Sequence, residues 1–366
     1  MNNEATSPYR FSRPQERARL QQWNIKETAE RVFFTTTQDG WQLAISHYRN
    51  NRLSPAHRHH PVLLCHGLGA NRLLFDIDRQ HSFAAWLLEQ GYDVYAVDLR
   101  SHGLSEKPEQ ASGKRWDWGF NAYCDADIPA AIDAVLADAG VEALHFIGHS
   151  MGGILLYCHA AQSDPRIVSG IAVAATLDYS GHPSIFHGLS RLVALTHLVP
   201  SMPMHWPALV CSKAAALGKP FMDSALVHPR NVDLQVYRRL TANLLHPVSS
   251  RLLRDMQHFV SGKGLQSSRQ ACYQQQLQHK GYTFPILSLS GTADTQCPPA
   301  SAARFGTHHQ IFGRAYGQRN DYGHLDLIMG MHALEETWPC MGAWLDQHDQ
   351  PATRADMPPL HMARSA

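Results

Sequence analysis

The sequence predicts an α/β protein, with a doubly wound, mostly parallel sheet that is interrupted by one helical insertion. Two observations lead to this class. Short apolar runs alternate with helical patterns along most of the 366 residues, and such alternation builds parallel sheets with right-handed crossovers. Between Thr176 and Phe284 lie roughly a hundred residues that carry helical patterns but no clear strand, and an unstructured loop of that length would be implausible.

The chain is expected to begin with a polar, loosely attached lead-in over residues 1–28. A hairpin follows. Arg31 to Thr37 and Trp41 to Tyr48 are rich in β-branched and aromatic residues, and Gln38-Asp39-Gly40 separates them. Asp-Gly between two such runs is a strong hairpin signal.

The later apolar runs predict buried parallel strands at Pro61 to Cys65, Tyr92 to Val97, Leu144 to Ile147, Ile167 to Ala175 and Phe284 to Leu289, with a further strand at Gln310 to Gly313. Helical patterns include Ser82 to Gln90, Ala126 to Ala139, Ile185 to Leu198 and Val232 to Val260. We therefore expect two core segments, 29–176 and 276–350, around a helical cap at 177–275. Residues 351–366 are expected to be a frayed tail.

The composition argues against several classes of function. A net charge of +1 gives no footprint for nucleic acid. The closest candidate for a membrane span, Leu192 to Ser212, lacks formal charge but is broken by three prolines, so stable membrane insertion is not expected. Met1 to Leu20 lacks the apolar run of a secretory signal, which favours a soluble cytoplasmic protein. The sequence leaves the oligomeric state open.

Histidine and cysteine usage predicts neither a metal site nor a disulfide framework. The 24 histidines are scattered, and neither an H-E-x-x-H pattern nor a Cys-x-x-Cys pair occurs. The seven cysteines are widely spaced, and several lie in apolar patterns. This usage suits buried free thiols.

The most informative stretch is Leu144 to Gly153, in which an apolar strand pattern leads into Gly148-His149-Ser150-Met151-Gly152-Gly153 and an apolar helix. A serine on so sharp a turn adopts a strained backbone, and the small residues around it let the turn close. Ser150 is therefore the predicted nucleophile.

A second glycine turn, His66-Gly67-Leu68-Gly69, follows an early strand. Such a turn can direct the backbone N–H of Leu68 toward the same place as that of Met151. Two donors of this kind form an oxyanion hole.

The predicted acid and base follow in the order that such a nucleophile requires. Asp294 lies just past a buried strand, and His324 comes 30 residues later in Gly323-His324. His324 would act as general base, and Asp294 would orient it. Asp178 is the alternative acid, and the alternative bases are His308, His309 and His332.

With these motifs in place, the chain resembles the α/β-hydrolase-fold serine hydrolases from about Arg31 to His348. The resemblance also includes Asp98-Leu99-Arg100-Ser101-His102-Gly103-Leu104-Ser105. Trp116 to Phe120 and Asp321 to Ile328 are similar to the acid-lipase-like branch, although Met151 stands where its secreted members usually have glutamine. The resemblance implies an eight-stranded sheet, a Ser150-Asp294-His324 triad, ester hydrolysis through an acyl-enzyme, and neither metal nor organic cofactor.

The cap is expected to select the substrate, a small ester or lipid-like molecule with an apolar acyl group. Met202, Met204 and Trp206 lie in its apolar part. Trp116 and Trp118 either line an acyl pocket or pack a loop. An acyltransferase with the same triad is the main alternative, and a non-catalytic ligand-binding protein is a weaker one.

Four neighbouring residues have structural interpretations. His149 is expected to pack beside the nucleophile, and Cys65 to be a buried, inert thiol. Asp98 and Arg100 are expected to organise hydrogen bonds at a strand end.

Overall fold

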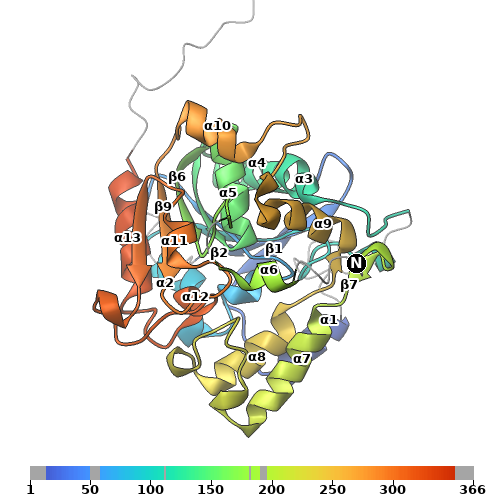
Figure 1. Cartoon of the computed structure of the whole chain (residues 1–366), viewed down its shortest axis with the longest axis vertical. Coiled ribbons are helices and arrows are strands. Elements are labelled where there is room, and N and C mark those ends of the chain that lie inside the picture. Colours follow the sequence, from blue (N-terminus) through green and yellow to red (C-terminus); the bar gives the residue numbers. More distant parts are fainter. Residues whose placement is uncertain (1–13, 50–57, 111–112, 181–182, 190–195, 351–366) are drawn as a thin grey trace, which may run out of the picture.

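The computed structural model describes residues 14–49, 58–110, 113–180, 183–189 and 196–350. Its centre is an eight-stranded sheet in the order β1-β2-β4-β3-β5-β6-β9-β10 (Figure 1). These strands are β1 (Arg31–Thr36), β2 (Gln42–Tyr48), β3 (Val62–Cys65), β4 (Val94–Asp98), β5 (Leu144–His149), β6 (Ile167–Val173), β9 (Ile286–Gly291) and β10 (His308–Phe312). β2 is antiparallel to both of its neighbours, β1 and β4, and all other neighbouring strands of this sheet are parallel, so the predicted mostly parallel fold is confirmed.

The predicted hairpin is present at the edge of the sheet. β1 and β2 pair antiparallel, with Arg31 opposite His47 and Thr36 opposite Gln42. Gly40 in the connecting turn has φ 84°, a left-handed conformation that glycine adopts at little cost.

Side chains alternate between the two faces of the sheet, as the two-residue period of a strand requires. In β3, Val62 and Leu64 pack into one hydrophobic cluster, whereas Leu63 and Cys65 pack into the other. The first cluster includes α2 (Phe83–Glu89), α12 (Asp326–Met329) and α13 (Thr337–His348); the second includes α4 (Ile128–Ala139), α5 (Met151–Ala161) and α10 (Tyr273–Lys280).

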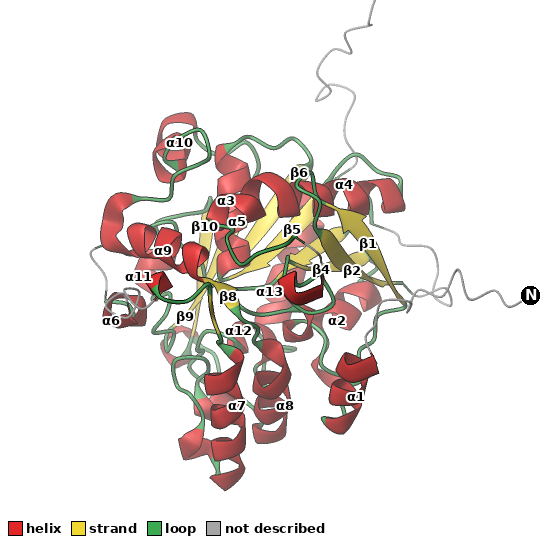
Figure 2. Ribbon diagram, turned by 90° about the vertical axis from the view of Figure 1, so that its right-hand side faces the viewer, coloured by secondary structure: helices red, strands yellow, loops and turns green. Residues whose placement is uncertain are grey.

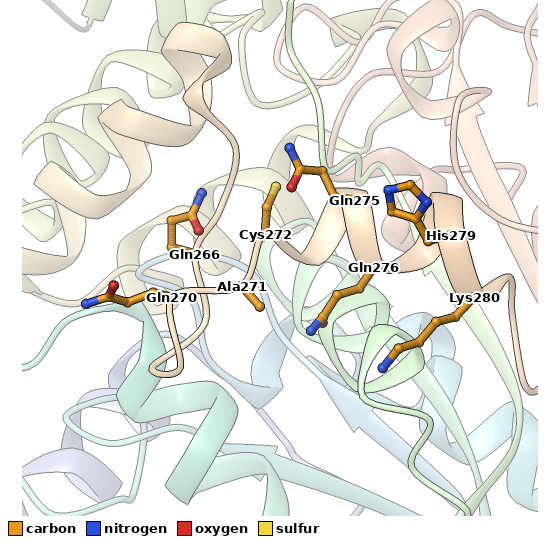
Figure 3. A pocket seen from close by; sticks show the side chains of 8 residues that line it. All are labelled: Gln266, Gln270, Ala271, Cys272, Gln275, Gln276, His279 and Lys280. Atoms are coloured by element: carbon orange, nitrogen blue, oxygen red, sulfur yellow. The ribbon is translucent and has the colours of Figure 1, made fainter.

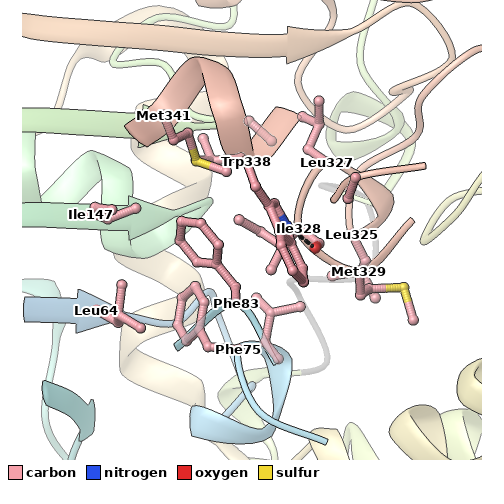
Figure 4. Packing of buried hydrophobic residues seen from close by; sticks show 14 of the residues in the cluster. Leu64, Phe75, Phe83, Ile147, Leu325, Leu327, Ile328, Met329, Trp338 and Met341 are labelled. Carbon is pink, nitrogen blue, oxygen red and sulfur yellow. Dashed lines mark hydrogen bonds between the residues drawn. The ribbon is translucent and has the colours of Figure 1, made fainter. Parts of the chain in front are cut away.

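Figure 4 shows the first of these clusters from close by. Phe83 lies beside the indole of Trp338, and the two ring centroids are 5.5 Å apart. Trp338 Nε1 donates a hydrogen bond to the Ile328 carbonyl at 2.8 Å. The buried indole therefore keeps its polar group satisfied while it joins α13 to α12.

Several element ends differ from the predictions, among them the end of β6 and the start of α4. β6 stops at Val173 rather than Ala175, because Ala174 has φ 54° and a left-handed residue cannot continue a strand. The predicted helix at Ala126 to Ala139 corresponds to α4, which starts at Ile128 and is preceded by the short helix α3 (Phe120–Ala122) and one turn of π-helix (Tyr123–Asp127).

The insertion between β6 and β9 contains helices and one small sheet. Its elements are α6 (Ile185–Leu189), β7 (Ser201–Met202), α7 (His205–Ala214), α8 (Leu234–Leu244), β8 (Val248–Ser249), α9 (Ser250–His258) and α10. β7 and β8 pair antiparallel, which the sequence did not predict. α7 and α8 lie side by side and extend away from the main sheet (Figure 2), and Ser212 Oγ donates to the Arg238 carbonyl at 2.7 Å.

The helix predicted at Val232 to Val260 is instead two helices, α8 and α9. Pro247 lies between them, and proline disfavours helix both at its own position and at the residue before it. α6 covers only the start of the helix predicted at Ile185 to Leu198, and residues 190–195 lie outside the described ranges.

The end of the lead-in packs against the body of the protein, contrary to the expectation of loose attachment. Its helix α1 (Pro14–Gln22) is fixed by Arg19, whose Nε donates to Asn243 Oδ1 at 2.9 Å. Ile25 is 6% exposed, and the backbone N–H of Thr28 donates to Asp76 Oδ2 at 2.6 Å. Residues 1–13 and the predicted tail 351–366 lie outside the described residues.

All seven cysteines are unpaired, and five of them are buried, which confirms the prediction of free thiols. Among the helices that the structure describes, none combines the length and the apolar character needed to cross a bilayer.

Candidate active site

Ser150 lies on the turn between β5 and α5 in a strained backbone conformation, with φ 53° and ψ −117°. Its N–H donates to the Val173 carbonyl at 2.8 Å, which ties the turn to β6. The turn is too tight for a side chain at Gly148 or Gly152. A Cβ on Gly148 would lie 2.2 Å from the Gly152 carbonyl carbon, and one on Gly152 would lie 2.3 Å from the Cys65 carbonyl oxygen. These glycines let the serine turn close against the end of β3.

The His66-Gly67-Leu68-Gly69 turn touches the serine turn directly. A Cβ on Gly67 would lie 3.0 Å from Ser150 Cβ. Buried His66 holds this turn, because its Nδ1–H donates to the Gly67 carbonyl at 2.8 Å and its Nε2 accepts from the Leu99 N–H at 3.1 Å. Burial lowers the pKa of His66, in agreement with a neutral ring that has one donor and one acceptor.

The backbone N–H groups of Leu68 and Met151 carry no hydrogen bond to another described residue. Met151 is the first residue of α5, and the N–H groups of a first helical turn have no partner within the helix. Both predicted oxyanion donors are therefore free to bind a ligand atom.

Asp294 and His324 form a buried pair in which His324 Nδ1 and Asp294 Oδ2 are 2.9 Å apart. The other carboxylate oxygen, Oδ1, accepts from the N–H groups of Gln296 and Cys297 at 2.8 and 2.9 Å. Both side chains of the pair are at most 4% exposed. With both oxygens engaged, the carboxylate has one defined orientation and fixes the imidazole ring.

The loop that carries His324 is anchored by Asp326, a residue to which sequence reasoning assigned no role. Its carboxylate accepts from the N–H of Gly323 at 2.9 Å and from Asn231 Nδ2 at 3.0 Å. Burial raises the pKa of Asp326 to about 6. One signal was available: a lone acid that opens the apolar segment Asp326-Leu327-Ile328-Met329.

His149 links the serine turn to His324. Its Nε2–H donates to the backbone carbonyl of His324 at 3.0 Å, and the two rings meet edge to face with centroids 4.8 Å apart. Burial lowers the pKa of His149 to about 3, so the ring is neutral. The sequence predicted only packing for His149; the structure adds this hydrogen bond.

The structure thus gathers the predicted serine, acid and base at the carboxyl ends of β5 and β9. No hydrogen bond joins Ser150 to His324 among the described residues. Such contacts are often long in proteins without a bound substrate.

The alternative acid and bases have other partners. Asp178 pairs with Arg304 at 2.7 Å. His309 Nε2 lies 2.9 Å from Ser290 Oγ, in the ladder of β9 and β10, and His308 precedes it on β10. His332 Nδ1 accepts from Arg319 Nη1 at 3.4 Å.

The Asp98 to Ser105 loop has the structural role that the sequence suggested. Burial alone would raise the pKa of Asp98, but buried Arg72 at 2.8 Å helps to hold it below its ordinary value. Arg100 Nη2 pairs with Asp127 at 2.6 Å, and Arg100 Nη1 pairs with Asp39 at 2.6 Å. Cys65 is buried, and burial raises the pKa of its thiol, so the thiol is unreactive.

The residues predicted to contact substrate differ in their neighbours and in their exposure. Trp116 stacks on Trp118 at a centroid distance of 5.0 Å, and Trp118 is 5% exposed. Met204 lies close to the His66–Gly69 turn, since a Cβ on Gly69 would be 4.0 Å from Met204 Cβ. Met202 is half-buried in β7, whereas Trp206 on α7 is 60% exposed.

A pocket of about 310 Å³ lies elsewhere, beside α10 (Figure 3). Its lining is mostly polar and includes Gln266, Cys272, Gln276, His279 and Lys280. No residue predicted for the active site lines it.

A mostly parallel eight-stranded sheet, with a strained serine between strand and helix, defines a protein of the α/β-hydrolase type. The family model described as alpha/beta hydrolase fold matches residues 60–330. The chain therefore belongs to this family.

Curated relatives match over part of their length. "Lipase lipl-3" of Caenorhabditis elegans is 28% identical over 140 residues, covering 36% of this chain and 35% of that protein. Gastric triacylglycerol lipase of Rattus norvegicus is 29% identical over 161 residues, covering 40% of each. In these alignments the chain spans between about a third and two fifths of the relative's length.

Solved structures match over most of the fold. A thermophilic esterase from Thermogutta terrifontis gives a TM-score of 0.56 at 18% identity and covers 87% of this chain and 100% of its own. A monoacylglycerol lipase from Paleococcus ferrophilus gives a TM-score of 0.53 at 20% identity and covers 84% and 99%. At such identities the match establishes a shared fold.

Proposed function

We propose that the protein is a serine hydrolase that cleaves carboxylic esters through an acyl-enzyme. One observation carries the proposal: Ser150 stands in a strained turn that is hydrogen-bonded through His149 to the residue that pairs with Asp294. The lipases and esterases among the relatives support the same class of reaction.

In the proposed first step, Ser150 Oγ attacks the ester carbonyl and His324 Nε2 takes its proton. The 2.9 Å contact between Nδ1 of the same ring and Asp294 supports this role, because an N–H donated from Nδ1 leaves Nε2 able to accept the proton. Asp294 also stabilises the imidazolium that forms. The proton then passes to the departing alcohol oxygen, and the acyl group remains on Ser150.

The negative charge of the tetrahedral intermediate falls on the former carbonyl oxygen. The free N–H groups of Leu68 and Met151 are the proposed donors to this oxygen, and each such donor typically contributes about 10²- to 10³-fold in kcat. In the second step a water molecule, activated by His324, attacks the acyl-enzyme and releases the acid.

We propose that the insertion acts as a cap that selects an apolar acyl group. A Cβ on Gly69 would lie 3.2 Å from Val248 Cγ2 and 4.0 Å from Met204 Cβ, so the proposed oxyanion turn adjoins apolar side chains of the cap. This setting suits a medium-chain or lipid-like ester.

Seven unpaired cysteines support the prediction of a reducing, cytoplasmic location.

The test is hydrolysis of p-nitrophenyl esters from short to long acyl chains by the wild type and by Ser150→Ala. We expect kcat to fall by about 10⁴-fold or more in this variant. Ser163→Ala is the matched control, because Ser163 also has a positive φ, 58°, and follows the other end of α5. Equal activity in both variants would disprove the proposal. Transfer to an added alcohol faster than hydrolysis would point to an acyltransferase.

A further inference from the structure

A second group of chemically versatile side chains lies at the opposite ends of the strands. His60 precedes β3, His145 is the second residue of β5, and Asp349 follows α13. One ligand atom from each of the three lies within 4.8 Å of the others. Ser150 directly follows β5, five residues after His145, so about 16 Å separates the cluster from the proposed active site.

The three side chains converge on one carboxylate oxygen. Asp349 Oδ1 lies 3.0 Å from His60 Nδ1 and 3.4 Å from His145 Nε2. The side chains of His60, His145 and Asp349 are 10%, 0% and 2% exposed. Among the described residues, the ion-pair partners of Asp349 are these two imidazoles, and neither lysine nor arginine pairs with it.

A buried carboxylate without a permanent cationic partner is costly unless another positive charge compensates it. Two imidazole nitrogens and one carboxylate oxygen are the ligand types that Zn²⁺ takes in proteins. With bond lengths of 2.0–2.1 Å, neighbouring ligands of a tetrahedral zinc ion lie about 3.3 Å apart. The distances of 3.0 and 3.4 Å to Asp349 Oδ1 agree with two such edges.

Supporting contacts hold the side chains in place. His145 Nδ1 lies 2.8 Å from Ser169 Oγ, which directs Nε2 of the same ring toward Asp349. The backbone N–H groups of His59 and His60 donate to the Asp349 carboxylate at 2.8 and 2.9 Å. Hydrogen bonds of this kind commonly orient the ligands of protein metal sites.

We propose that His60, His145 and Asp349 bind one divalent cation of the zinc class, with water as the fourth ligand. The ion would join the C-terminal end of α13 to the starts of β3 and β5. Its role would be structural, because the site is remote from Ser150. No short sequence pattern predicts this site, since His60 and Asp349 are 289 residues apart in the chain.

The test uses the full chain without a polyhistidine tag, stripped of metal by a chelator and titrated calorimetrically with ZnCl₂, CoCl₂ and MgCl₂. We expect one saturable Zn²⁺ site per chain and tetrahedral absorption bands with Co²⁺. MgCl₂ should give no binding heat, because Mg²⁺ prefers oxygen ligands in octahedral geometry.

Variants identify the ligands. Asp349→Asn and His60→Gln should each weaken Zn²⁺ binding by more than about 100-fold, because loss of a supporting hydrogen bond alone typically costs 10- to 100-fold. His59→Gln is the control, since His59 is exposed and adjacent in sequence but its ring is outside the cluster. If Asp349→Asn fails to fold, the Zn²⁺ affinity of His60→Gln alone decides whether the cluster binds the ion.

Two results would overturn the proposal. One is the absence of a saturable site in the wild type, which would leave a hydrogen-bonded cluster only. The other is Zn²⁺ binding that His59→Gln weakens as much as His60→Gln does, which would indicate adventitious binding by surface histidines. Neither result depends on whether the protein hydrolyses esters.

Discussion

The two ends of the sheet both carry a buried contact between histidine and aspartate, yet their surroundings differ. At the carboxyl end, Asp294 meets one ring at 2.9 Å, and a strained serine lies nearby. At the amino end, Asp349 meets two rings, at 3.0 and 3.4 Å, on regular strand ends. A short distance between an imidazole ring and a carboxylate therefore does not by itself identify an active site, because both ends of the sheet have one.

The difference lies in what the backbone around each pair provides. At the carboxyl end, Ser150 has a positive φ, its turn touches the His66–Gly69 turn, and the N–H groups of Leu68 and Met151 carry no hydrogen bond to another described residue. At the amino end, the nearby N–H groups of His59 and His60 are already bound to the carboxylate. The first arrangement suits reaction and the second suits binding or structural support.

The largest effect is expected at the acid of the proposed triad. Asp294→Asn should lower kcat by about 10⁴-fold, because the amide favours the wrong tautomer of His324. Asp164→Asn is the matched control: Asp164 forms another buried contact of 3.0 Å, with His159. Its kcat should stay at the wild-type value. A similar loss in both variants would mean that the Asp294 pair is merely structural.

The proposed oxyanion turn offers the next test. Gly67→Ala would place a Cβ 3.0 Å from Ser150 Cβ and 3.1 Å from His149 Nδ1. The turn must then shift and carry the Leu68 N–H with it, so we expect kcat to fall by about 10²-fold with little change in KM. Gly188→Ala meets open space and should behave as wild type. A pure KM effect in Gly67→Ala would contradict the role of Leu68.

Low pH should decrease the free energy of unfolding, because the buried ring of His149 is neutral in the folded protein and takes up a proton on unfolding. Its pKa is about 3 when folded and about 6.5 when unfolded, so the stability it contributes is present above pH 6.5 and is lost as pH falls toward 3. Between pH 7 and pH 5 this amounts to about 2 kcal/mol of unfolding free energy. Urea titrations at both pH values should show that His149→Gln reduces the loss by that amount. An unchanged loss would mean that His149 is not held neutral.

The smallest effect concerns the cap. Met204→Ala should raise KM for long-chain esters by about tenfold, the size of a lost apolar contact in a pocket. Trp206→Ala should not, because Trp206 is 60% exposed. Equal changes in both variants would mean that the pocket is elsewhere in the cap.

Sequence patterns predicted the sheet and the three proposed catalytic residues because their signals are local. Glycines around Ser150 and apolar runs before Asp294 reflect backbone geometry within a few residues. The break between α8 and α9 also has a local signal in the sequence, because Pro247 lies between the two helices and could have predicted it.

Other features depend on contacts between distant segments. The β7–β8 pairing joins Met202 to Val248, and the His324 loop is fixed by Asp326 and Asn231 across 95 residues. The docking of the lead-in through Arg19 and Asn243 is of the same kind. No short pattern in the chain encodes such contacts, so sequence reasoning missed them.

The most direct test of the central claim is covalent labelling of the nucleophile. The purified full chain would be treated with a fluorophosphonate and digested, and the modified peptide located by mass spectrometry. We predict one adduct per chain, on Ser150, absent from Ser150→Ala and retained in Ser163→Ala. No adduct in the wild type, or an adduct on a different residue, would contradict the assignment of Ser150 as the catalytic nucleophile.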